Sequence, residues 1–383
     1  MKVDAPCRVL QDFGCSSFPV LLAIMLFTPA TESLAQDDLE MKEPSNWSHF
    51  IDVRLESGYR DNPTYTSSNP SGTTFGTIKL DHTLIRLPVD AWQVTVLTTV
   101  DATRLFDSDL AKHELFTFGL FQLQKESAPG RSWEAGLQHI YQDQTIDAST
   151  TILNQGSVNI HGHTLQGYGR WKQQWVTGWW IALKPMLEWQ TVEQPLDDSY
   201  EPGISFSLGQ DASKRTSYSL TYDYQERVFD RMTPTDEFGI AVLGDELRFR
   251  QHHVEASARW ELDEAKVWRL TARAGWRRIT DNGQDYFDHD RGRMALELRF
   301  RRKHWEIKLS SRASYYDYDI QKIAGAGSNE REKLLLLTGL QAKRNFNNGC
   351  YLILRGEHEQ SLSNLTTDRY VANTASIGIG WEN

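Results

Sequence analysis

The stretch "WRLTARAGWRR" (268–278) decides the fold class, because its alternate residues have opposite character. In a strand, successive side chains point to opposite faces. One face would be entirely apolar, with Trp268, Leu270, Ala272, Ala274 and Trp276. The other would carry three guanidinium groups, those of Arg269, Arg273 and Arg277. In a soluble sandwich the apolar face would be the core, whereas in a membrane barrel it would meet lipid and the arginines would face a wet lumen.

The same alternation recurs in segments along the chain after residue 46, and no amphipathic helix interrupts it. Strands of roughly ten residues with this pattern are typical of outer-membrane barrels. We count sixteen segments. The clear ones lie at 51–55, 78–84, 92–100, 133–137, 179–189, 218–224, 254–260, 268–276, 294–300, 305–315 and 375–381. The weaker ones lie near 113–125, 160–172, 203–209, 333–343 and 350–360.

The connections between these segments alternate between short and long. Short turns rich in Pro, Gly, Asn and Asp are expected at 87–91, 127–131, 174–178, 209–215, 262–266, 301–304 and 346–349. Long polar loops are expected at 60–74, 104–112, 142–158, 190–202, 226–246, 280–291, 317–331 and 360–369. A soluble sandwich has no reason to alternate in this way, whereas an outer-membrane barrel has short periplasmic turns and long external loops.

Tryptophan placement agrees with the barrel. Five tryptophans start a segment directly after a short turn, namely Trp92, Trp133, Trp179, Trp268 and Trp305. Such a belt is favoured at a membrane interface. We therefore predict an all-β protein, a transmembrane antiparallel up-and-down β-barrel of about sixteen strands over residues 47–383.

The N-terminus is typical of an export signal. Lys2 and Arg8 precede the apolar run "FPVLLAIMLF" (18–27), and small residues at Ser33 and Ala35 suit cleavage after Ala35. We predict a signal peptide at 1–35 and a short periplasmic segment at 36–46. Cleavage would leave Cys350 as the one cysteine, so no internal disulfide is expected. The net charge of −10 argues against a nucleic-acid partner.

The terminal "ASIGIGWEN" (375–383), together with the Trp-flanked strands and the signal, resembles bacterial outer-membrane β-barrel proteins. The stretch "ESGYRDNPTY" (56–65) is similar to openings in porin-like barrel families. The resemblance implies the outer membrane of a Gram-negative bacterium, contact with lipid and lipopolysaccharide, and insertion by the barrel-insertion machinery. Homo-oligomer partners and periplasmic export partners both stay open.

Catalytic patterns are scarce. The sequence has no Gly-x-Ser-x-Gly and no His-Glu-x-x-His motif. His161 and His163 would share a strand face, but no Cys or carboxylate lies beside them, so we predict no metal site there. The acidic stretch from Asp285 to Asp290 is expected to be a solvated loop tip, with a divalent cation as the alternative, and no other cofactor is expected. We expect no enzyme, with an outer-membrane lipid-modifying hydrolase as the alternative.

The predicted lumen is ionic. A basic wall is expected from Arg269, Arg273, Arg277, Arg299, Arg301, Lys308 and Arg312. An acidic wall is expected from Asp52, Glu56, Glu357 and Glu359. Two interpretations remain open, either facing walls that create a transverse field or charges that pair across strands and fill the interior.

These features favour a channel for small hydrophilic solutes, because a barrel of about sixteen strands leaves a water-filled interior unless it is plugged. The alternatives are the outer-membrane outlet of a polysaccharide or other export system, and a closed structural barrel. The export alternative should use periplasmic partners, for which residues 36–46 offer no binding domain.

Overall fold

The computed structural model describes residues 46–67, 70–89, 91–107, 112–147, 157–193, 197–238, 240–322 and 330–383. The predicted signal peptide and the segment at 36–46 lie outside the described residues, apart from Asn46. No helix in the described part of the chain is long and apolar enough to cross a membrane.

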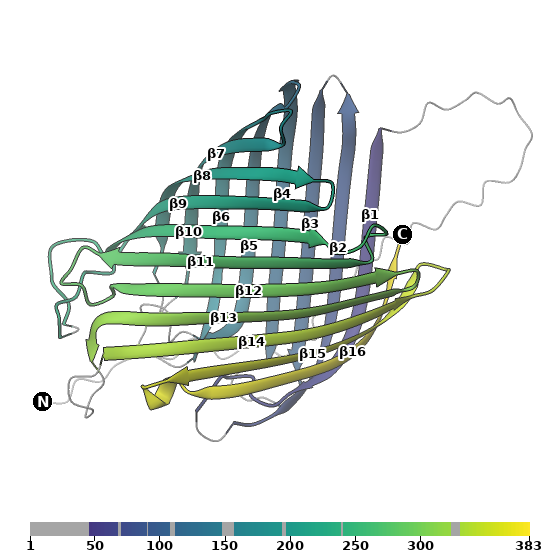
Figure 1. The fold of residues 1–383 in the computed structure, drawn as a ribbon. Coiled ribbons are helices and arrows are strands. Elements are labelled where there is room, and N and C mark those ends of the chain that lie inside the picture. Colours follow the sequence, from purple (N-terminus) through teal and green to yellow (C-terminus); the bar gives the residue numbers. More distant parts are fainter. Residues whose placement is uncertain are drawn as a thin grey trace, which may run out of the picture. The chain divides into compact units, whose positions relative to one another are not determined.

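Sixteen antiparallel strands close into one barrel, which confirms the predicted fold class (Figure 1). Each strand pairs with its neighbours in sequence, and β1 pairs with β16 to complete the ring. The strands are β1 Trp47–Arg60, β2 Thr73–Val89, β3 Trp92–Leu105, β4 His113–Ala128, β5 Arg131–Asp147, β6 Ser157–Gln174, β7 Trp179–Val192, β8 Ser199–Ser213, β9 Thr216–Phe229, β10 Arg248–Glu261, β11 Trp268–Asp281, β12 His289–Arg302, β13 Trp305–Lys322, β14 Glu330–Asn345, β15 Cys350–Ser363 and β16 Tyr370–Glu382. A 3₁₀ turn, η1 (Thr366–Asp368), precedes β16.

The last residues of the chain seal the barrel. Trp381 is the register partner of Val53, and the backbone and side chain of Asn383 bond to both polar groups of Ile51. The Ile51 N–H donates to Asn383 Oδ1 at 2.7 Å, and Asn383 N–H donates to the Ile51 carbonyl at 3.2 Å. The two residues after Trp381 therefore extend the β1–β16 ladder by which the barrel closes.

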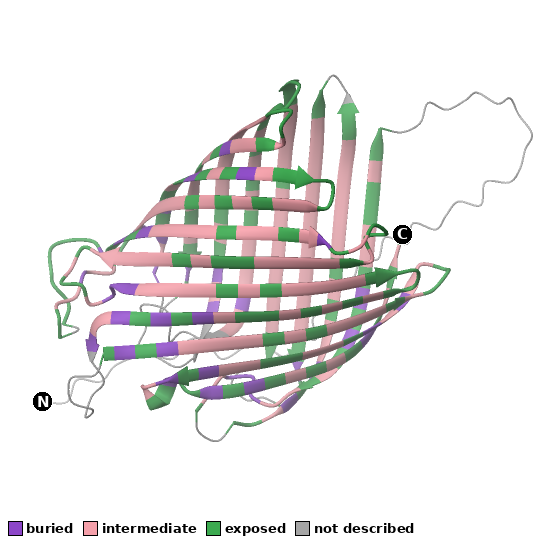
Figure 2. Ribbon diagram, in the orientation of Figure 1, coloured by how far each residue is buried: buried purple, intermediate pink, exposed green. Residues whose placement is uncertain are grey.

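The outer surface of the barrel is apolar and the inner surface is polar. Large side chains such as Trp276, Leu296 and Ile379 are exposed on the outside, where lipid would cover them. Figure 2 shows exposed positions alternating along the strands with less exposed ones. Buried charged groups such as Arg54 and Glu56 belong to the inner face. This is the arrangement expected when the solvent outside is hydrocarbon.

The connections follow the predicted alternation, but the strands reach further into the long loops than expected. The expected loop at 280–291 shrinks to 282–288, and the expected loop at 190–202 shrinks to 193–198. Beyond the apolar band both faces of a strand are polar, so the alternation that marks a strand in the sequence fades there. The strand ends were therefore misread as loop.

Candidate pore lining

The seven predicted basic residues all lie on the inward face of β11, β12 and β13. Register partners share a face, so the pairing fixes their orientation. Arg299 is the register partner of Arg269 on β11 and of Lys308 on β13. This row of three cations lies near the short-turn end of the barrel. Arg301 lies two residues closer to that end and is the register partner of Glu306. Arg277 lies toward the long loops.

Three members of this set are neutralised by neighbouring carboxylates. Arg269 Nη2 lies 2.8 Å from Glu261 Oε1, and Arg299 Nη2 lies 2.8 Å from Glu306 Oε1. Lys308 Nζ lies 2.9 Å from Glu297 Oε2. The short-turn half of the basic wall is thus a ladder of ion pairs, as the charge-pairing interpretation expected.

The middle of the wall is different. Arg273 and Arg312 are both register partners of Ala295, one from each side. Both side chains are exposed although they face the interior of a closed ring. Within the described ranges, neither guanidinium has a hydrogen bond or an ion pair. Their charges are therefore available to solutes in the lumen.

On the strands of the basic wall, sequence reasoning missed two further inward-facing arginines, Arg291 and Arg293. Arg291 falls in the expected loop at 280–291, and Arg293 lies between that loop and the expected strand at 294–300, whereas β12 begins at His289. Arg293 is paired with Gly275 and with Ser314, and Arg291 lies over the ring of Tyr316, with its Cζ 4.9 Å from the ring centroid. The alternation of Arg291 and Arg293 with Gly292 was the available signal.

The four predicted acidic residues all line the inward face, but cations are interleaved with their carboxylates. Asp52 and Glu56 lie on the inward face of β1, and Glu357 and Glu359 lie on that of β15. Glu56 forms ion pairs with Arg54 and with Arg355, whose Nη1 is 3.4 Å from Glu56 Oε1. Asp52 accepts a hydrogen bond from the Tyr351 hydroxyl, and Glu359 accepts one from the Tyr370 hydroxyl. The wall is mixed in charge.

The two predicted walls also do not face each other. In a ring of sixteen strands, the strand opposite β12 is β4, eight positions away. The inward face of β4 is mostly uncharged and consists of Glu114, Phe116, Phe118, Leu120, Gln122 and Gln124. The mixed wall of β15 and β1 lies only three to five strands from β12. The basic wall is therefore opposed by a neutral surface.

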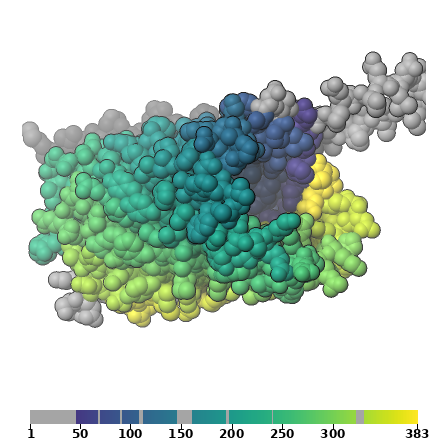
Figure 3. All heavy atoms as spheres, turned by 45° about the horizontal axis from the view of Figure 1, so that its top comes forward, coloured from purple at the N-terminus to yellow at the C-terminus, as the bar shows by residue number. Residues whose placement is uncertain are grey.

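The lumen narrows toward the long loops. A cavity of about 250 Å³ is lined on one side by Ile160 and Val192 and on the other by Arg277 and Tyr318, which belong to strands four to seven positions apart in the ring. Its wall includes aromatic side chains of a buried cluster formed by Phe229, Leu247, Phe249 and Phe287. At the other end, where the purple start of β1 and the yellow C-terminal strand meet, Figure 3 shows the surface hollowed.

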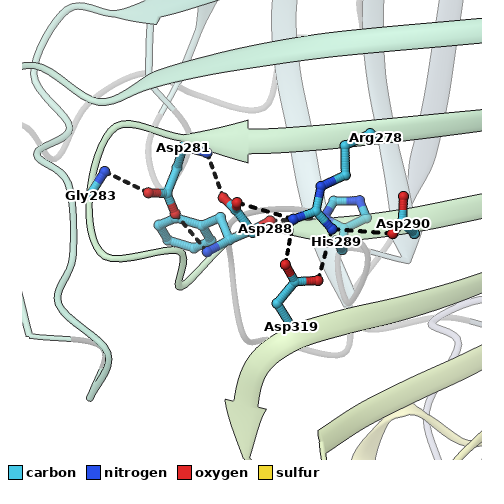
Figure 4. A network of polar contacts seen from close by, with 8 residues as sticks. Arg278, Asp281, Gly283, Asp288, His289, Asp290 and Asp319 are labelled. Atoms are coloured by element: carbon cyan, nitrogen blue, oxygen red, sulfur yellow. Dashed lines mark hydrogen bonds and ion pairs between the residues drawn. The ribbon is translucent and has the colours of Figure 1, made fainter.

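The acidic loop after β11 is held by Arg278, which faces outward (Figure 4). Its guanidinium is 3.4 Å from Asp288 Oδ2 and 3.2 Å from Asp290 Oδ2, and it binds Asp319 through both terminal nitrogens. Asp281 accepts hydrogen bonds from the backbone N–H groups of Gly283 and Phe287. Burial of Asp288 raises the pKa of its carboxyl to about 6.

Arg278 therefore lies among the carboxylates for which a divalent cation was the alternative ligand. Arg278 supplies the positive charge among the carboxylates of this loop. Within the described residues, no group of three metal-ligating side chains has the arrangement of a metal site, and this includes His161 and His163. Those two rings face outward from β6, where His163 Nδ1 lies 3.2 Å from His139 Nε2 and the Tyr141 hydroxyl lies 3.5 Å from His161 Nδ1.

The five belt tryptophans all lie at the short-turn end of the barrel with exposed side chains. Their exposed fractions are 41–53%, and they stand at or next to the first residues of their strands: Trp92, Trp133, Trp179, Trp268 and Trp305. Trp47 and Trp381 add two more exposed rings at the same end. Lys125 Nζ lies 5.0 Å from the ring centroid of Trp92, as expected of a cation near a membrane interface.

Several solved structures are similar to this chain at low sequence identity. OccAB3 of Acinetobacter baumannii is 9% identical with a TM-score of 0.49, and the alignment covers 88% of this chain and 99% of that one. OccK2 of Pseudomonas aeruginosa, solved with glucuronate, is 10% identical with a TM-score of 0.48 over 88% and 97%. A bacterial polysaccharide outer membrane secretin is 11% identical with a TM-score of 0.45 over 86% and 97%. No family model and no curated protein matches the chain.

Proposed function

We propose that this protein is an outer-membrane channel that admits small hydrophilic solutes through a charged lumen. The observation that carries the proposal is the exposure of Arg273 and Arg312 on the inward face of a closed barrel. Long charged side chains remain unpaired where water can hydrate them, because an isolated charge in a dry interior costs several kcal/mol or more. A wet space in mid-barrel follows.

The charge distribution favours anions over cations of the same size. The unpaired arginines stand on one wall, and the wall opposite is nearly neutral. Their field extends over roughly a Debye length, about 8 Å at physiological salt, which is a substantial part of a lumen of this class. An anion that moves along β11–β13 is therefore stabilised by Coulomb attraction that no opposing wall cancels.

The narrow region near the long loops supports selection among solutes. There Arg277 and Gln251 lie beside apolar groups such as Phe249 in the same cavity. A solute must shed part of its hydration to pass such a region, and polar groups then decide which solutes are admitted. A selective channel fits this arrangement better than a wide diffusion pore.

Solute entry into liposomes tests the proposal. The refolded protein should let neutral monosaccharides swell the liposomes faster than larger oligosaccharides, whereas protein-free liposomes should not swell. Heat-modifiable gel mobility checks that the barrel has folded. Folded protein that admits no solute in the swelling assay would contradict a channel and favour the closed structural barrel.

The proposal also gives the protein a cellular location and binding partners. The exposed apolar band and the belt at the short-turn end suit an outer membrane with the short turns in the periplasm. The partners expected there are outer-membrane lipid, lipopolysaccharide and the barrel-insertion machinery. Fractionation of the native membranes tests this placement, and recovery with the inner membrane would contradict it.

A further inference from the structure

We propose that Arg273, Arg293 and Arg312 form a binding site for an oxyanion halfway along the lumen, with inorganic phosphate as its simplest ligand. The site rests on the proposed function, since a solute must be able to enter the barrel to reach it. It goes further in naming a locus and a chemical class of ligand.

The register places the three arginines around one small residue. Arg273 and Arg312 flank Ala295 from the two neighbouring strands, and Arg293 lies two residues along β12 on the same face. Directly opposed residues have Cβ atoms roughly 5 Å apart, so the first two arginines start about 10 Å apart across the alanine. Guanidinium groups on side chains of this length can converge on a common ion between them.

The alanine leaves space for that ion. The recess beside Ala295 has a volume of about 130 Å³ and is lined by Arg273, Arg293, Arg312, Ser310 and Thr271 among others. One water needs roughly 10–15 Å³ of such space, so the recess holds several water molecules or a small anion. Thr271 adds a hydroxyl group that can donate to oxygen, whereas the Ser310 hydroxyl donates to the Gly339 carbonyl at 3.5 Å.

The charges of these arginines are not cancelled locally. Arg293 lies in the positive fields of Arg312, Arg291 and Arg273, with Glu255 as the opposing negative charge. Glu297 also lines the recess, but it is paired with Lys308 at 2.9 Å. Within the part of the chain that the structure describes, none of the three arginines forms an ion pair.

Three like charges on one face repel one another unless an anion lies among them. Each guanidinium presents N–H groups in a planar fork that matches two oxygens of a phosphate or carboxylate. Phosphate offers enough oxygens and charge to engage all three forks, whereas a carboxylate engages fewer. The arrangement therefore favours phosphate over a monocarboxylate.

Calorimetric titration of the refolded barrel in detergent micelles tests the site without any need for conduction. Inorganic phosphate should bind the wild-type protein at low salt, more tightly than acetate does. Arg293→Gln and Arg312→Gln should each weaken phosphate binding about tenfold or more, because each removes a charge-assisted contact. Arg293→Lys, which keeps the charge but loses the fork, should lie between.

Arg170→Gln is the matched control. Arg170 also faces the lumen, but on β6, with its Nη1 3.7 Å from Glu134 Oε2. Its loss should leave phosphate affinity unchanged. Absence of phosphate binding, equal affinity for acetate, or equal weakening by Arg170→Gln would each overturn the site. Phosphate binding to a barrel that admits no solute into liposomes would keep the site and refute the channel.

Discussion

Arg273 and Arg312 stand on either side of Ala295, each paired in register with that alanine from a different neighbouring strand. The short side chain between two long cationic ones leaves a polar recess in the wall of the barrel. One residue away, the outward face of the same strands carries Ala272 and Leu296, which lie where lipid is expected. The outward face of β11 and β12 should therefore reject a charged side chain, whereas the inward face should tolerate both charged and apolar ones.

A charge on the outward face should be costly. Ala272→Arg places a guanidinium near the middle of the apolar band and should destabilise the barrel in liposomes by roughly 2–4 kcal/mol. Arg273→Leu, on the adjacent inward position, should leave stability largely unchanged because the lumen is wet. Denaturant unfolding in lipid measures both variants. Normal insertion of the arginine variant together with failure of the leucine variant would mean that the faces are inverted.

The topology predicts which loops a reagent outside the cell can reach. In a Cys350→Ser background, Gln284→Cys lies in the loop at 282–288 and Glu264→Cys in the short turn at 262–267. A membrane-impermeant maleimide added to intact cells should label the first and not the second. Both should react once the cells are broken, which controls for intrinsic reactivity. The reverse pattern in intact cells would reverse the orientation.

The loop at 282–288 should respond to mild acid through Asp288. Its folded-state pKa of about 6 lies above the ordinary value near 4, so the folded loop binds the extra proton. The stabilisation from this proton is complete below about pH 4 and is lost as the pH rises through 6. Hydrogen exchange in the loop should therefore quicken between pH 4 and 6, after correction for the intrinsic rate.

Substitution separates this effect from other titrating groups. Asp288→Asn should remove most of the pH dependence, whereas Asp285→Asn in the same loop should retain it. An unchanged pH profile in the Asp288→Asn protein would show that another group is responsible.

A buried ion pair anchors the connection between β15 and β16. Arg331 and Asp368 are each only 3% exposed in their side chains, and Arg331 Nη2 lies 2.6 Å from Asp368 Oδ2. Asp368→Asn would remove this carboxylate from the buried ion pair and should cost about 3–5 kcal/mol. Denaturant unfolding and protease cleavage near residue 366 measure the loss. Asp230→Asn, at an exposed position, should change stability by less than about 0.5 kcal/mol, and equal effects would contradict the anchor.

The alternating strands and the alternating turn lengths could be predicted from the sequence, because both follow from the apolar band around the barrel. The band ends before the strands do. At residues 289–293 both faces of β12 are polar, so the alternation predicts a strand only from residue 294. The ion pairs of the lumen could not be predicted from the sequence either. Lys308 contacts Glu297, for example, only because of the register between β12 and β13. The cations beside the acidic residues could not be predicted for the same reason, because Arg355 reaches Glu56 across β16.

The reversal potential of the refolded protein in a planar bilayer under a KCl gradient tests the central claim, an open lumen with an anion-attracting wall, most directly. The wild-type channel should conduct and favour chloride. Arg273→Gln, Arg293→Gln and Arg312→Gln combined should shift the potential toward potassium preference, and the shift should shrink at high salt because screening shortens the field. A wild-type protein without conductance, or a low-salt reversal potential unchanged by the triple substitution, would contradict the account.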